Sequence, residues 1–69
     1  MSKSHGLIEV LKAKPAAVIA DSEGITRQAI SQWDEVPHNR VLSIERLTGV
    51  SRHVIRPDLY PLDAEAANG

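Results

Sequence analysis

The 69-residue sequence has no cysteine and no phenylalanine, and it has one tryptophan and one tyrosine. Without cysteine, neither disulfide bonds nor thiolate-bound metal can hold the fold, so a small apolar core must stabilise it, alone or with a partner subunit. With so few aromatic residues, that core has to be built from valine, isoleucine, leucine and alanine. A chain of this length forms one small domain without a large cavity, so we expect no cofactor and no small-molecule ligand.

Long hydrophobic runs are also missing. The longest apolar run, Ala16 to Ala20 with its neighbours, is far shorter than the roughly 18 residues that a membrane-spanning helix needs. The opening residues, MSKSHGLIEV, lack the apolar stretch of a secretory signal peptide. We therefore expect a soluble, cytoplasmic protein that has no membrane partner.

A positive net charge is missing as well. The formal net charge is −1, which gives no general electrostatic argument for nucleic-acid binding. The distribution of charge is more informative, because residues 1–57 hold all eight basic residues and six of the nine acidic ones. The other three acids lie in the last twelve residues, which contain no base. We expect one domain over residues 1–61 and a flexible acidic tail over residues 62–69.

Proline and glycine divide the remaining sequence into short segments, and none of these shows the alternation typical of a strand. Apolar periodicity and capping residues predict helices over residues 4–14, 15–22, 27–34, 37–48 and 51–56. Gly24 and Gly49 stand where a left-handed residue commonly ends a helix. The predicted fold class is all-α, a compact domain of four to five helices. The side chains expected in its core include Leu7, Ile8, Val10, Leu11, Val18, Ile19, Ile25, Ala29, Ile30 and Trp33.

The second and third predicted helices have the pattern of a helix-turn-helix, whose second helix enters the major groove of DNA. Gly24 lies in the short turn between them. Ala20 supplies a small residue where the helices must cross closely, and Thr26 is a typical N-cap for the second helix of the motif.

One outward stripe of the second motif helix carries polar side chains at spacings i, i+1, i+4 and i+5. Arginine can pair with guanine through two hydrogen bonds, glutamine can do so with adenine, and serine can donate or accept. The residues that we expect to contact bases are Arg27, Gln28, Ser31 and Gln32.

Phosphates are expected to contact a second set of polar residues, at helix ends and in flanking elements. These residues are Lys14, Thr26, His38, Asn39 and Arg40. About 3 to 5 phosphate contacts per subunit predict a salt-sensitive affinity that requires a dimer.

The segment GITRQAISQWDEVPHNRVLSIERLTG resembles the Cro repressors of lambdoid phages. Continued into VSRHVIRPDLYP, it is similar to the YdaS-type antitoxins. The resemblance covers about residues 7–61 and implies a five-helix, repressor-like domain. It further implies a weak homodimer that binds a double-stranded DNA operator and represses transcription in a bacterial cell. The same four residues of the stripe take the base-contacting positions in this family.

Two residues depart from the family pattern. Ala16 stands where many helix-turn-helix proteins have a phosphate-binding glutamine, so that contact is expected to be absent. Glu23 stands where an apolar residue usually precedes the turn glycine, which suggests either a solvent-facing turn or local strain.

Simpler interpretations accompany these predictions. The polar stripe could be merely solvated on an ordinary helical domain, and the motif could bind a protein, as an antitoxin that neutralises its partner directly would. We expect Trp33 to belong to the core rather than to stack on a base. Asp34 and Glu35 either serve solubility or repel phosphates at the far end of the base-contacting helix. The segment RPDLYP either covers the core with Leu59 and Tyr60 or forms a dimer contact.

Catalytic and metal sites have no support in the sequence. The three histidines are separated by 33 and 15 residues, which matches no local metal-ligand spacing. No nucleophile, base and acid occur in a pattern that would place them in one pocket. We therefore expect that the protein is not an enzyme and holds no metal.

Overall fold

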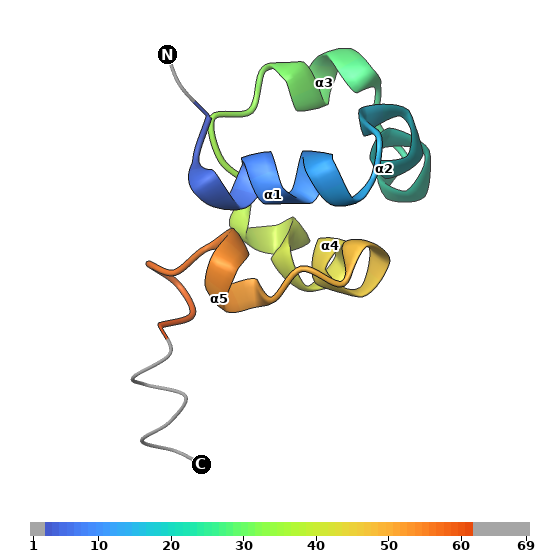
Figure 1. Cartoon of the computed structure of the whole chain (residues 1–69). Coiled ribbons are helices and arrows are strands. Elements are labelled where there is room, and N and C mark those ends of the chain that lie inside the picture. The colour runs from blue at the N-terminus through green and yellow to red at the C-terminus, as the bar shows by residue number, and fades with distance from the viewer. Residues whose placement is uncertain (1–2, 62–69) are drawn as a thin grey trace.

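The computed structural model describes residues 3–61, and every regular element in this range is helical (Figure 1). The α-helices are α1 (His5–Ala13), α2 (Ala16–Glu23), α3 (Arg27–Ser31), α4 (Val41–Thr48) and α5 (Arg52–Ile55), and a 3-10 turn, η1 (His38–Arg40), precedes α4. This confirms the prediction of an all-α domain. The predicted acidic tail over residues 62–69 lies outside the described residues.

Three of the helix starts and two of the helix ends have the capping residues that the sequence predicts. The hydroxyl oxygens of Ser4, Thr26 and Ser51 accept hydrogen bonds of 3.1–3.2 Å from amide groups two or three residues later. Gly24 and Gly49 end α2 and α4 with φ values of 71° and 78°. Glycine adopts this left-handed conformation without the steric penalty of a side chain.

The core is aliphatic and draws on each of the five α-helices. Full burial of one such side chain contributes about 1.5–3 kcal/mol relative to leaving it exposed. Its buried members are Leu7, Val10, Ile19, Ala20, Ile30, Val36, Val41, Ile44 and Ile55. Val36, in the linker after α3, is as completely buried as the helical members of this set.

Two residues expected in the core are on the surface instead. Ile8 is 40% exposed and Val18 is 43% exposed. Each adjoins a buried neighbour, Leu7 and Ile19 respectively, and one residue along a helix rotates the side chain by about 100°. Because Leu7 and Ile19 face the core, the next side chain turns away from it.

The backbones of helices α1 and α5 lie against each other at Gly6. A Cβ atom at this position would collide with the carbonyl oxygens of Val54 and Ile55 and would lie 2.6 Å from the Cα of Ile55. Glycine in a helix normally lowers stability. Here its lack of a side chain allows the two backbones to meet and brings Leu7 and Ile55 into one core.

Helix α3 is shorter than predicted and ends at Ser31, with Gln32 as its C-cap. The predicted continuation to Asp34 is wrong. The chain leaves the helix and carries Val36 into the core before η1 begins. Trp33 therefore follows α3 rather than sharing its inner face, and its side chain is half-buried against the core. Residues 38–40 form a 3-10 turn instead of the first turn of the predicted fourth helix.

Candidate nucleic-acid interface

Helices α2 and α3 form a tight helix-turn-helix arrangement. Gly24, Ile25 and Thr26 connect them, and the Ile25 amide donates a 2.9 Å hydrogen bond to the Ala20 carbonyl. Ala20 is 4% exposed and Ile30 is 1% exposed, so the facing sides of the two helices are closed. Ala20, the small residue that is predicted at the helix crossing, is therefore buried next to the turn.

The outer side of α3 carries the predicted base-contacting residues, all of which are exposed. These are Arg27, Gln28, Ser31 and Gln32. Within residues 3–61, no hydrogen bond or ion pair engages their side chains. Their hydrogen-bonding groups are therefore free for a ligand, since no internal partner has to be displaced.

The predicted phosphate-contacting residues fall into two groups. Lys14, Thr26, His38 and Asn39 are exposed, whereas Arg40 is only partly exposed. Thr26 already uses its hydroxyl oxygen to accept a hydrogen bond as the N-cap of α3. Its hydroxyl hydrogen remains available to an acceptor such as a phosphate oxygen.

Arg40 is held by Glu23. Its Nη1 donates to the Glu23 carboxylate at 2.9 Å and to the Glu23 backbone carbonyl at 3.3 Å. The Ser43 hydroxyl donates to the other carboxylate oxygen at 2.6 Å. The Glu23 side chain is only 4% exposed, so of the two alternatives for this residue, a solvent-facing position does not apply to its side chain. The carboxylate is tolerated in the turn because α4 and η1 supply a charge and hydrogen bonds to both of its oxygens.

Arg56 forms a second polar cluster that the sequence analysis did not identify. Its Nε and Nη2 donate to the two carboxylate oxygens of Asp58 at 3.0 and 2.8 Å, and its Nη1 donates to the Val36 carbonyl at 2.7 Å. Glu35 lies 3.5 Å from the same guanidinium. The cluster therefore attaches the linker after α3 to the end of α5. The RPD sequence is its only local signal, because Val36 and Glu35 are brought there by the fold.

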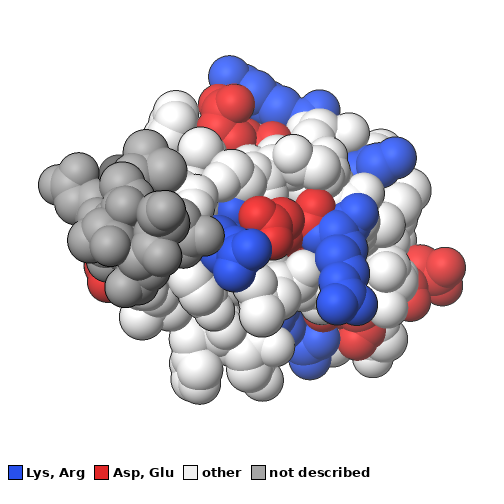
Figure 2. All heavy atoms as spheres, turned by 90° about the horizontal axis from the view of Figure 1, so that it is seen from below, with Lys and Arg blue, Asp and Glu red and all other residues white. Residues whose placement is uncertain are grey.

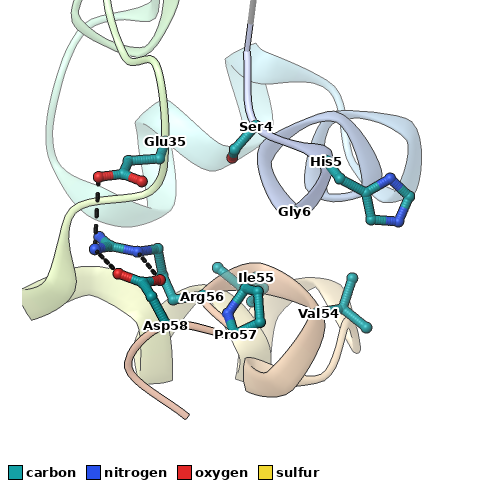
Figure 3. Close-up of a pocket in the computed structure, with 9 residues that line it drawn as sticks. All are labelled: Ser4, His5, Gly6, Glu35, Val54, Ile55, Arg56, Pro57 and Asp58. Atoms are coloured by element: carbon teal, nitrogen blue, oxygen red, sulfur yellow. Dashed lines mark hydrogen bonds and ion pairs between the residues drawn. The ribbon is translucent and has the colours of Figure 1, made fainter. Parts of the chain in front are cut away.

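The hydrogen bond from Arg56 lowers the pKa of the Asp58 carboxyl, and the hydrogen bond to Asp58 likewise raises the pKa of Arg56. Figure 3 shows these groups at one edge of a surface hollow of about 440 Å³ between the start of α1 and the end of α5. Ser4, His5 and Val54 also line this hollow.

The structure gives Asp34 and Glu35 a different setting from the one expected. Because α3 ends at Ser31, neither lies within the helix that is predicted to contact bases. Glu35 pairs with Arg56, and the Asp34 carbonyl accepts a 2.7 Å hydrogen bond from the Ser4 amide. Repulsion of phosphates by these two acids stays a prediction.

The RPDLYP segment covers the core with one of its two apolar residues. Tyr60 packs against the core, while Leu59 is 43% exposed. The His53 ring and the Tyr60 carbonyl are 2.6 Å apart, with Nδ1 as the donor because a carbonyl oxygen only accepts. The Arg52 guanidinium lies over the Tyr60 ring at 5.8 Å from its centroid.

The face opposite α3 has mixed charge. Figure 1 places α3 at the top and α5 at the bottom, and Figure 2 shows the molecule from below, with basic and acidic groups side by side. Ion pairs such as Arg52 with Glu45 at 3.6 Å belong to α4 and α5. Such a surface does not attract a polyanion as a block of basic residues does.

A protein-family model described as "Bacterial toxin YdaS" matches residues 13–63. The chain belongs to the YdaS family. This match spans both motif helices, the Glu23–Arg40 pair and the Arg56 cluster. Neither the curated proteins nor the solved structures contain a significant match. The YdaS part of the expected resemblance is thereby confirmed, although the description names a toxin where the sequence suggested an antitoxin. Within residues 3–61 of this YdaS-family chain, no helix is long and apolar enough to span a membrane.

Proposed function

We propose that this YdaS-family protein is a sequence-specific DNA-binding regulator that dimerises on an operator and represses transcription. The observation that carries this proposal is the exposed α3 stripe, whose side chains have no internal partner within residues 3–61. Most basic side chains elsewhere in that range are engaged in hydrogen bonds or ion pairs, including those of Lys3, Lys12, Arg40, Arg52 and Arg56. The side chain of Arg27 is thus available for a ligand, whereas most other basic side chains in that range are already engaged.

The chemistry of the stripe fits base edges in the major groove. Arg27 and Gln28 occupy the first turn of α3, and their planar groups can each form two hydrogen bonds with one base. Ser31 and Gln32 lie at the other end and would contact bases further along the site. The exposed groups of Lys14, Thr26, His38 and Asn39, with the remaining donors of Arg40, would fix the register on the phosphates.

Dimerisation follows from the small number of these phosphate contacts. About 3 to 5 neutralised phosphates give one subunit only a modest, salt-dependent affinity. A weak homodimer would contact two half-sites about one helical turn apart, so the operator should be a near-palindrome.

A selection from random double-stranded DNA at about 100 mM salt tests the proposal, since non-specific binding weakens at this ionic strength. We expect an enriched palindromic sequence for the wild type. The matched controls are Arg27→Ala, which removes a base-contacting group, and Arg46→Ala, which removes an exposed arginine of α4 that has no ion pair in the described part of the chain. The absence of any enriched sequence with the wild type would contradict the proposal.

The family description favours a second candidate, a protein that inhibits bacterial growth. Inhibition could act through DNA or through a protein partner, and the antitoxin alternative also requires a protein partner. Controlled expression of the wild type and of an Arg27→Ala, Gln28→Ala double variant in a bacterial host separates these routes. Growth inhibition that the double variant abolishes supports action through DNA. Inhibition that persists after operator binding is lost supports a protein partner.

A further inference from the structure

The N-terminal segment contacts the far end of α3. Lys3 Nζ donates to the backbone carbonyls of Ser31 and Trp33, each at 2.9 Å. One residue later, the Ser4 amide donates to the Asp34 carbonyl at 2.7 Å. Figure 1 shows the start of α1 beside the segment that follows α3. Two residues from the beginning of the domain are therefore attached to the chain where the base-contacting helix ends.

Helix α3 needs such an attachment because it is short. It has five residues. The amides of Gln32 and Trp33 already satisfy the carbonyls of its middle residues, but within residues 3–61 no backbone amide donates to the carbonyls of Ser31 and Trp33 at the end of the helix. Its last turn would fray readily without outside contacts. An ammonium group at the C-terminal end satisfies these carbonyls and interacts favourably with the negative end of the helix dipole. Lys3 supplies this group from 28 and 30 residues away in sequence.

Two of the four base-contacting candidates, Ser31 and Gln32, lie at this end. Their backbone position depends on how α3 ends, whereas Arg27 and Gln28 lie beside the Thr26 cap at the other end. We infer that Lys3 is a positioning residue for the C-terminal half of the base-contacting helix. By fixing the carbonyls of Ser31 and Trp33, it sets base discrimination by Ser31 and Gln32 without touching DNA. This inference rests on the proposed function.

Three variants of the full chain test the inference. Lys3→Met removes the ammonium group but keeps an unbranched side chain, and Lys3→Arg keeps a cationic donor. Lys12→Met is the matched charge control, since Lys12 is 72% exposed and its one ion pair within residues 3–61 is with Glu9 on the surface of α1. Thermal unfolding identifies a temperature at which every variant is folded. Affinities are then measured for the selected operator and for its single-base variants.

We expect Lys3→Met to reduce discrimination at the bases nearest Ser31 and Gln32 by about fivefold, the lower end of what a good base contact provides. Discrimination at the bases contacted by Arg27 and Gln28 should fall clearly less, because the Thr26 cap holds that end of α3 and does not involve Lys3. Lys3→Arg should restore most of the loss, and Lys12→Met should cause none. Trp33, the only tryptophan, provides a DNA-free measurement, and its emission should change in Lys3→Met but not in Lys12→Met.

Two outcomes would overturn the inference alone. If Lys3→Met weakens binding to all sequences equally and lowers the salt slope by about one, Lys3 is a phosphate contact. If Lys3→Met leaves discrimination at every base unchanged, Lys3 has only a structural role, even where the Trp33 emission changes. If the wild type itself shows no discrimination, the proposed function fails, and the inference fails with it.

Discussion

Arg40 and Glu23 form an ion pair of 2.9 Å in which the glutamate side chain is only 4% exposed and the arginine side chain is 29% exposed. Since Arg40 also donates to the Glu23 backbone carbonyl, it caps the end of α2. One arginine thus joins α4 to the turn of the helix-turn-helix. We therefore assign Arg40 a structural role, and its contact with a phosphate stays a prediction.

The first prediction concerns this pair. Arg40→Ala leaves the nearly buried Glu23 carboxylate with Ser43 as its remaining partner. Because the arginine side of the pair is open to solvent, we expect a cost of about 1–3 kcal/mol, which is less than for a fully buried pair. That is a large share of the roughly 3–10 kcal/mol total stability of a chain of this size. Urea denaturation followed by circular dichroism measures the change. The milder variant Glu23→Gln can still accept from Arg40 through its amide oxygen and donate from its NH2 group to the Ser43 hydroxyl oxygen. It should therefore cost clearly less than Arg40→Ala.

Arg46→Ala is the control for this measurement, because Arg46 is exposed and unpaired within residues 3–61. It should change the free energy of unfolding by no more than about 0.5 kcal/mol, as is usual for surface substitutions. An Arg40→Ala protein as stable as the Arg46→Ala protein would show that the pair does not form in solution.

Local sequence patterns predicted the helices but not the polar clusters, and the reason is sequence separation. Caps such as Thr26 and turn glycines such as Gly24 act on residues within one helical turn, so the local sequence identifies them. The partners of Glu23, by contrast, are Arg40 and Ser43, which lie 17 and 20 positions further along the chain. Its burial could not be predicted without the packing of α2 against α4.

The end of α3 illustrates the same limit. Its apolar spacing predicts a continuation to Asp34, yet the helix stops at Ser31. The contacts found at this end are long-range, namely the hydrogen bonds from Lys3 and the burial of Val36 in the core, and the local sequence does not reveal them. For the candidate interface, the exposed α3 stripe was predictable from helical periodicity, whereas the engagement of Arg40 by Glu23 was not.

The second prediction concerns the contact between α1 and α5. Gly6→Ala places a methyl group against the backbone oxygens of Val54 and Ile55. Overpacking of this kind typically costs about 1–3 kcal/mol, and more where backbone atoms must move. Alanine gains about 1 kcal/mol over glycine in a helix, which offsets only part of the loss. We expect a lower free energy of unfolding, measured by urea denaturation.

Gly49→Ala is a comparison variant, whose expected loss of stability has a different physical cause. A Cβ at Gly49 has no heavy atom within 4 Å, but the residue has a φ of 78°. Its cost should be about 1–2 kcal/mol, from the left-handed backbone alone. If Gly6→Ala were as stable as the wild type, the close approach of α1 and α5 would be incorrect.

The third prediction is a dependence of stability on pH. The hydrogen bond from Arg56 lowers the pKa of Asp58 in the folded protein. Asp58 therefore binds a proton less readily in the folded state than in the unfolded state, where the pKa of an aspartate is about 3.9. The stabilisation from Asp58 is present above that pH, and it is lost as the pH falls through the lower folded-state value.

Thermal unfolding of the wild type and of Asp58→Asn between about pH 2 and pH 6 measures this effect, since the window spans the ordinary aspartate pKa. The wild type should be the more stable protein at the upper end, and the difference should shrink as the pH falls. A difference that stays constant across the range would show that the Asp58 charge does not contribute.

The last prediction concerns Arg27, the exposed arginine in the first turn of α3. A bidentate pair with guanine is worth about 1–3 kcal/mol of discrimination, so Arg27→Ala should weaken operator binding by this amount and relax the preference at one base position. Fluorescence anisotropy with the operator and with its single-base variants measures both effects. Arg46→Ala, with the same charge removed from α4, should keep the full preference. An equal loss of affinity on every DNA sequence would instead assign Arg27 to a phosphate, and the base contacts of α3 would then rest on Gln28, Ser31 and Gln32.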